Sequence, residues 1–69
     1  MIIANIFSYG GPEKGWNKYS DCILTFKNER RFLFFAKYYT SKNDVLIKVY
    51  HLGQWVASYC NGEEIWNCY

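Results

Sequence analysis

The chain has 69 residues, a net charge of +2 and an aromatic content of 22%, with three Trp and seven Tyr. This length predicts a single domain, residues 1–69, which buries only about 60% of the surface that its unfolded form exposes. The hydrophobic fraction of 51% excludes intrinsic disorder, and the small net charge lacks the strong basic excess of a dedicated duplex-binding protein.

Two strands joined by a loop are predicted for the first 26 residues. Residues 2–8 and 20–26 are short and rich in residues that favour strands. The segment between them, YGGPEKGWNK, contains three Gly and the only Pro of the chain, so we expect a loop. Trp16 lies in this loop and must either fold back over apolar surface or point towards a partner.

The segment RRFLFFAKYY, residues 30–39, mixes aromatic and basic residues and admits two structures. Aromatic residues favour a strand over 31–39, which would give an all-β small barrel. Asn28 as an N-cap, Glu29 at the positive end of a helix dipole and an apolar stripe with helical spacing favour a helix near 29–40. The stripe consists of Phe32, Phe35, Ala36 and Tyr39, with Leu33 beside it. We take the helix as the prediction and the barrel as the alternative.

Three more strands are predicted in the C-terminal part, over residues 45–50, 54–60 and 64–69. The connections HLGQ and Asn-Gly are typical of tight hairpins. If each loop has two residues, the strands pair in a fixed register. Tyr50 then lies opposite Trp55, Leu46 opposite Tyr59, and Ala57 opposite Trp66.

This register predicts a sheet with one aliphatic and one aromatic face. The aliphatic face comprises Val45, Ile47, Val49, Val56 and Ile65. The aromatic face comprises Leu46, Lys48, Tyr50, Trp55, Tyr59 and Trp66, with Glu64 and Cys68. An amphipathic helix fits the aliphatic face, so the predicted fold is α+β: one antiparallel sheet of five strands with the helix on one side. The aromatic face is then either covered by the loop that carries Trp16 or exposed as a surface for a partner.

No catalytic, cofactor or metal motif stands out. Cys22, Cys60 and Cys68 are an odd number without the short spacing of zinc ligands, and His51 lies in or next to a turn. We therefore expect no enzyme activity, no cofactor and no metal. The start of the chain lacks the features of a signal peptide, and no stretch reaches the ~18 apolar residues of a membrane span. The expected location is a reducing cytoplasm, with no membrane partner.

The aromatic face predicts a protein-interaction module, because Trp and Tyr are the residues enriched at binding hot spots. The predicted partner-binding residues are Lys48, Tyr50, Trp55, Tyr59 and Trp66, with Trp16. The partner would be a host protein or a second copy of the chain. The abundance of Ile, Asn, Lys, Phe and Tyr is typical of AT-rich genes, such as those of phages and mobile elements. We therefore expect a protein of this origin that binds a host protein and inhibits or redirects it.

The alternative function is binding of single-stranded nucleic acid, with aromatic side chains for stacking and scattered basic residues for the phosphates. The basic residues predicted for this role are Arg30, Arg31, Lys37 and Lys48.

Overall fold

The computed structural model describes residues 1–68. Over this range it contains five strands and one helix, in the order β1 (Ile2–Ser8), β2 (Cys22–Phe26), α1 (Glu29–Lys42), β3 (Val45–His51), β4 (Gln54–Cys60) and β5 (Glu63–Asn67). The predicted α+β class is confirmed. The all-β barrel is wrong, because residues 31–39 lie inside α1 and the sheet does not close. Tyr69, the last residue of the predicted C-terminal strand, lies outside the described residues.

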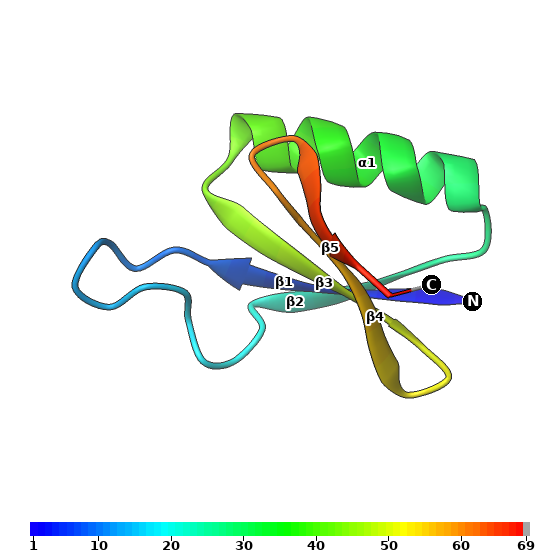
Figure 1. The fold of residues 1–69 in the computed structure, drawn as a ribbon, viewed down its shortest axis with the longest axis horizontal. Helices are drawn as coiled ribbons and strands as arrows, with labels where there is room; N and C mark the ends of the chain where they lie inside the picture. Colours follow the sequence, from blue (N-terminus) through cyan, green and yellow to red (C-terminus); the bar gives the residue numbers. More distant parts are fainter. Residues whose placement is uncertain (69) are drawn as a thin grey trace.

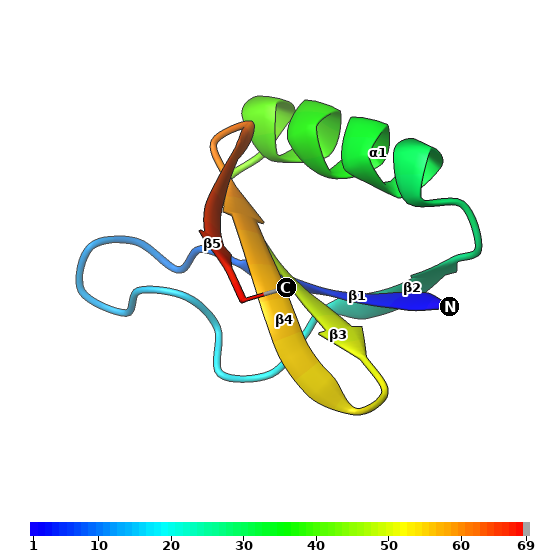
Figure 2. The ribbon, with the colours of Figure 1, turned by 45° about the vertical axis from the view of Figure 1, so that its right-hand side comes forward.

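The sheet has the strand order β2-β1-β3-β4-β5, and all neighbouring strands are antiparallel. The connection through α1 carries the chain from the edge strand β2 back to the central strand β3 (Figure 1). Figure 2 shows α1 lying along one side of the sheet, while the long β1–β2 loop projects from one end of the molecule. The sheet therefore has one face covered by α1 and one face without a helix.

Capping residues define both ends of α1. Asn28 adopts an extended backbone, and its side chain accepts a hydrogen bond from the Arg31 N–H at 3.1 Å, which satisfies one of the free donors of the first turn. At the other end, both the N–H and the side-chain amide of Asn43 donate to the Tyr39 carbonyl at 3.0 Å. The helix continues to Lys42, two residues beyond the predicted end.

The core lies between α1 and the sheet. The predicted helix stripe is confirmed: Phe32 and Ala36 are buried, and Phe35, Tyr39 and the neighbouring Leu33 are partly buried against the same cluster. The strands contribute Ala4, Ile6, Val45, Ile47, Val49, Val56, Ala57 and Tyr59. Removing such aliphatic and aromatic side chains from water is the main favourable term in a domain of this size.

Both C-terminal hairpins have the predicted two-residue loops. His51 pairs with Gln54 across one turn, and Cys60 pairs with Glu63 across the other. The loop residues Leu52, Gly53, Asn61 and Gly62 all have positive φ, between 51° and 78°. Two successive residues with positive φ form a type I′ turn, whose twist matches that of the flanking strands.

A β-bulge in β4 changes part of the predicted register. The expected pairing of Tyr50 with Trp55 is confirmed, but the next pair along the strands is Val49 with Ala57, so Val56 is an extra residue. The predicted pairing of Leu46 with Tyr59 is therefore wrong. Tyr59 lies opposite Ile47 and faces α1, with only 3% of its surface exposed.

A second bulge lies in β5 and changes the predicted positions of Ile65 and Glu64. Trp66 pairs with Ser58 rather than with Ala57, and Glu64 pairs with Tyr59, which leaves Ile65 as the extra residue. Ile65 is consequently exposed, so its predicted place on a buried aliphatic face is wrong. Glu64 moves to the side of Tyr59 and accepts a hydrogen bond from its hydroxyl at 3.2 Å.

Candidate functional site

The face of the sheet opposite α1, called the open face below, carries the side chains that alternate with the core residues along each strand. Its members are Ile3, Asn5, Phe7, Ile23, Thr25, Leu46, Lys48, Tyr50, Trp55, Ser58, Cys60 and Trp66. No helix covers it within residues 1–68 (Figure 2). Phe7, Leu46 and Ser58 are buried on this face, so the surface available to a partner comes from its exposed residues, above all Trp55 and Trp66.

A pair of tryptophans forms the centre of the exposed aromatic surface. The rings of Trp55 and Trp66 lie 4.5 Å apart between centroids, on neighbouring strands, and are 43% and 41% exposed. The indole N–H of Trp55 donates to the Ala57 carbonyl at 3.1 Å and to the Ser58 hydroxyl at 2.9 Å. These bonds fix the Trp55 ring, so a ligand that contacts it pays little ordering cost.

Lys48 connects this pair to the middle of the sheet. Its ammonium nitrogen lies 4.8 Å from the centroid of the Trp55 ring and 5.1 Å from that of Phe7. A cation between two ring faces is attracted by both quadrupoles, by about 0.5–2 kcal/mol depending on exposure. Lys48 therefore bridges two aromatic residues on neighbouring parts of the open face.

The structure brings most of the predicted partner-binding residues to one face. Lys48, Tyr50, Trp55 and Trp66 share the open face. Tyr59 does not, because the bulge at Val56 turns its side chain into the core. Phe7 was missed by the sequence analysis, although it alternates with Ile3 and Asn5 along β1, and this alternation was the signal that would have placed it.

Trp16 lies at one end of the open face rather than over its middle. It forms an isolated antiparallel bridge with Tyr9, the residue after β1, and the two ring centroids are 5.0 Å apart. Backbone hydrogen bonds close the stem of the loop, from Asn17 to the Ser8 carbonyl at 2.9 Å and from Gly10 to the Gly15 carbonyl at 2.7 Å. Both aromatic rings remain partly exposed, beside a hollow of about 300 Å³.

The alternative set of basic residues does not form a single surface. Arg30, Arg31 and Lys37 lie on the outer side of α1, whereas Lys48 lies on the open face across the sheet. The outer side of α1 nevertheless has aromatic residues of its own. The rings of Phe34 and Tyr38 are nearly parallel, at 3° and 6.2 Å between centroids, and Phe34 is 74% exposed.

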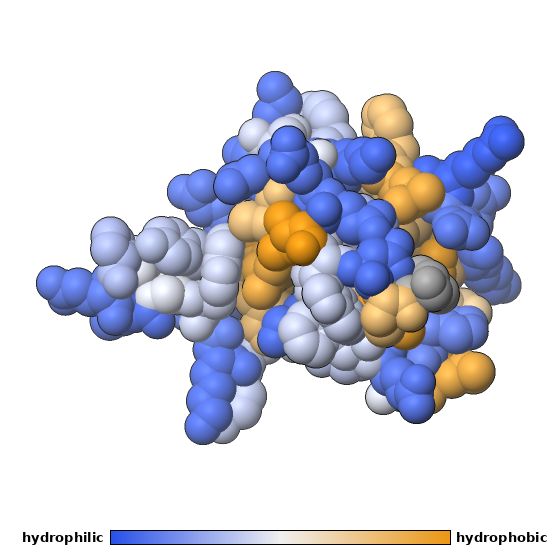
Figure 3. All heavy atoms as spheres, viewed as in Figure 1, coloured by the Kyte–Doolittle hydropathy of each residue, from blue (hydrophilic) through white to orange (hydrophobic). Residues whose placement is uncertain are grey.

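The space-filling view adds the distribution of hydrophobic surface. Figure 3 shows the strongly hydrophobic residues as separate patches on this side of the molecule, with mainly hydrophilic atoms over α1. The projecting β1–β2 loop appears in pale and blue colours. Trp and Tyr lie near the middle of the hydropathy scale, so aromatic contact surface does not appear as a hydrophobic patch in this picture.

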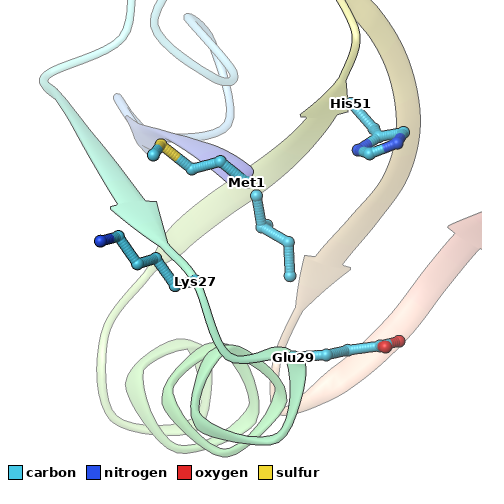
Figure 4. A pocket seen from close by; sticks show the side chains of 5 residues that line it. Met1, Lys27, Glu29 and His51 are labelled. Atoms are coloured by element: carbon cyan, nitrogen blue, oxygen red, sulfur yellow. The ribbon is translucent and has the colours of Figure 1, made fainter.

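A hollow of about 430 Å³ lies where β1, the start of α1 and the β3–β4 hairpin meet, and Figure 4 shows its lining residues. They are Met1, Ile2, Lys27, Glu29 and His51. In this view the Lys27 amine and the Glu29 carboxylate point to opposite sides, and His51 lies apart from both. A small-molecule site needs polar groups that converge, so this hollow offers no catalytic arrangement.

The cysteines of the described chain are free thiols. Burial raises the pKa of the Cys60 thiol, a backbone hydrogen bond from Asn61 opposes this, and the negative charge of Asp44 adds to the increase. No three His, Cys, Asp or Glu side chains within residues 1–68 are grouped so that they could hold a metal ion. In the same range, no helix has the length and apolar character required to cross a membrane.

Comparison with protein-family models, with curated proteins and with solved structures finds no match for this chain.

Proposed function

We propose that the protein is a non-catalytic interaction module that binds another protein through the open face of its sheet. The observation that carries the proposal is the Trp55–Trp66 pair: hydrogen bonds hold the Trp55 indole, Trp66 packs against it, and both rings are more than 40% exposed. Trp, Tyr and Arg dominate the energetics of protein interfaces, and rigid aromatic anchors bind at low entropic cost.

The distribution of aromatic residues supports this role. A domain of 69 residues has little material for a core, but all three Trp residues stand at the surface, and the core relies on smaller side chains. We propose that the partner is a host protein, and that a phage or mobile element encodes this module to inhibit or redirect it in the host cytoplasm. Inhibition would follow from occupying the partner's surface, with one module per site.

Replacing the exposed edge tryptophan is the sharpest test. Trp66→Ala removes half of the aromatic pair from the edge strand β5, and we expect it to weaken partner binding by about 2–4 kcal/mol. Affinity capture from nuclease-treated cell lysate with the wild-type protein identifies the partner, and calorimetry with the purified partner then gives the two dissociation constants. The nuclease step separates protein partners from those held by nucleic acid.

Tyr38→Ala is the matched control, because it removes an exposed aromatic ring from the opposite side of the molecule. It should leave the dissociation constant unchanged, and circular dichroism should show folded protein for both variants. Equal affinity of the wild type and Trp66→Ala would rule out the open face as the docking surface. If the partner is a second copy of the chain, sedimentation would show a dimer that Trp66→Ala dissociates.

A second candidate function is favoured by the outer side of α1. At 100° per residue, Arg30, Arg31, Phe34, Lys37, Tyr38 and Lys42 fall within one arc of about 140°. The helix carries four basic side chains and one acidic one, hence a net charge of +3, whereas the whole chain has only +2. Exposed rings beside basic residues are the elements of a surface that stacks the bases and contacts the phosphates of single-stranded nucleic acid.

This second candidate makes a distinct prediction about salt. Affinity for a single-stranded oligonucleotide should fall steeply between 50 and 200 mM salt, and Arg31→Gln with Lys37→Gln should reduce both the affinity and the salt dependence. Lys48→Gln, on the other face, is the control and should change neither. An affinity that is flat with salt would exclude this function.

A further inference from the structure

Two aromatic residues and one acidic residue line a hollow of about 300 Å³ at the end of β1. Its lining residues are Tyr9, Trp16, Asp44, Cys60 and Asn61. The rings of Tyr9 and Trp16 are inclined at 59° with 5.0 Å between their centroids, so they form an angled aromatic wall. Ring faces attract cations through their quadrupoles, and a carboxylate adds a full negative charge.

The backbone holds this arrangement in place. Tyr9 and Trp16 are paired by a β-bridge, and the hydrogen bond from the Gly15 N–H to the Gly11 carbonyl at 2.8 Å closes the turn between them. The Tyr9 N–H donates to the Asp44 carbonyl at 3.2 Å, which ties the segment before β3 to the end of β1. The aromatic wall and the backbone of Asp44 are therefore positioned before any ligand arrives.

The charge of the hollow is negative. The Asp44 carboxylate forms no hydrogen bond or ion pair with another residue of the range 1–68, and no Lys or Arg belongs to the lining. Burial raises the pKa of Cys60, so this thiol stays protonated at neutral pH and adds no charge.

The open face already contains one cation held between two aromatic rings. Between Phe7 and Trp55 the chain inserts its own cation, the Lys48 ammonium group, within 5.1 Å of both ring centroids. The hollow at Tyr9 and Trp16 repeats the two rings and adds a carboxylate, but no basic side chain of the lining occupies it. We propose that this hollow binds an organic cation, either a guanidinium or an alkylated ammonium group.

The cation could reach the hollow as the end of an Arg or methylated Lys side chain on another protein, or as a free small molecule. Both sources present the same chemistry: a positive charge spread over carbon or nitrogen atoms that lose little hydration on binding. The proposal does not depend on the docking role of the open face, because the isolated cation suffices to test it.

The test uses the 69-residue chain and NMR. Titration with tetramethylammonium chloride at constant ionic strength should shift the Trp16 indole N–H signal and the backbone signals of Tyr9 and Asp44, with saturation in the millimolar range. tert-Butanol, a neutral molecule of similar size and shape, should leave these signals in place. Titration with the N-acetyl N-methylamides of arginine, lysine and trimethyllysine separates the sources. The guanidinium and trimethylammonium forms should bind more tightly than the plain ammonium.

Variants separate the ring and charge contributions. Trp16→Leu should weaken tetramethylammonium binding by about tenfold, and Asp44→Asn should weaken it as well. Trp66→Leu removes an indole elsewhere on the same face and should leave this binding unchanged. Asp44→Asn preserves the shape of the side chain, so its spectrum reports binding in a folded protein even if Trp16→Leu alters the loop. Equal shifts with tert-butanol, or unchanged affinity in Asp44→Asn, would overturn the proposal.

Discussion

Leu52 occupies a backbone conformation that suits other residues better. It is the first residue of a type I′ turn, with φ of 51°, and 89% of its surface is exposed. Asn61 takes the same position in the following hairpin, with φ of 53°. Asn is tolerated in this left-handed region, whereas a leucine there places its Cβ too close to the next carbonyl oxygen.

We therefore expect Leu52→Asn to stabilise the protein by about 1 kcal/mol, since it relieves this contact and loses almost no burial. Urea unfolding monitored by Trp fluorescence measures the change. The reciprocal variant, Asn61→Leu, should lower the free energy of unfolding by a similar amount. A destabilised Leu52→Asn variant would mean that the exposed leucine makes a favourable contact.

Cys60 should react more slowly with alkylating reagents in the folded protein than in the unfolded chain. Burial raises its pKa, so at a given pH the folded protein contains less of the reactive thiolate than the unfolded chain. The pH dependence of alkylation by iodoacetamide should accordingly move to higher pH for Cys60 in the folded protein. Mass spectrometry of the Cys60 peptide, with the protein in urea as reference, measures both profiles. Coincident profiles would contradict this prediction.

The raised pKa of Cys60 also makes the stability of the protein depend on pH. Because the thiol binds its proton more tightly in the folded state, its contribution to the free energy of unfolding is complete below the pKa of the unfolded thiol. It is lost as the pH rises through the pKa of the folded one. Alkaline conditions should therefore weaken the fold at this residue rather than strengthen it.

At the scale of elements, a buried threonine joins α1 to the β4–β5 hairpin. The Thr40 hydroxyl donates to the Ala36 carbonyl at 2.6 Å and accepts from the Gly62 N–H at 2.9 Å. A Cβ placed on Gly62 would lie 3.1 Å from the Ser41 Cβ, so the turn packs closely on the last helical turn. The helix extends past Tyr39 because the hydroxyl groups of Thr40 and Ser41 donate to carbonyls of the preceding helical turn instead of ending the helix.

Thr40→Val keeps the shape of this side chain but leaves the Gly62 N–H without its acceptor. We expect it to cost about 1–2 kcal/mol of stability and to accelerate hydrogen exchange at the Gly62 amide. Thr40→Ser retains the hydroxyl and should keep that amide protected, although it loses one methyl group. Unchanged protection of Gly62 in Thr40→Val would show that the bond does not hold the hairpin.

At the scale of the whole molecule, the fold separates two chemically different surfaces. The outer side of α1 is basic, with a net charge of +3 on the helix, while the remaining residues together are weakly negative. The open face has aromatic residues, and its Lys48 is engaged by two rings. Because the core lies between these surfaces, substitutions on one surface can be made with little effect on the other, which is the basis of the paired controls above.

Local sequence determined most of the elements. Asn28 and the stripe of Phe32, Phe35, Ala36 and Tyr39 predict α1, because capping and helical periodicity depend only on residues within a few positions. Asn61–Gly62 predicts its hairpin, because a type I′ turn requires two residues that accept positive φ. The α+β class and the placement of the helix on the aliphatic side follow from these patterns.

Tertiary structure decided which side chains reach the open face. The bulges at Val56 and Ile65 shift the alternation by one residue, which turns Tyr59 into the core and exposes Ile65. No local pattern marks these positions, because a bulge is selected by packing against α1 and by the twist of neighbouring strands. The meeting of Tyr9, Trp16 and Asp44 likewise depends on contacts between segments far apart in the chain, so only the folded protein brings the two rings and the carboxylate together.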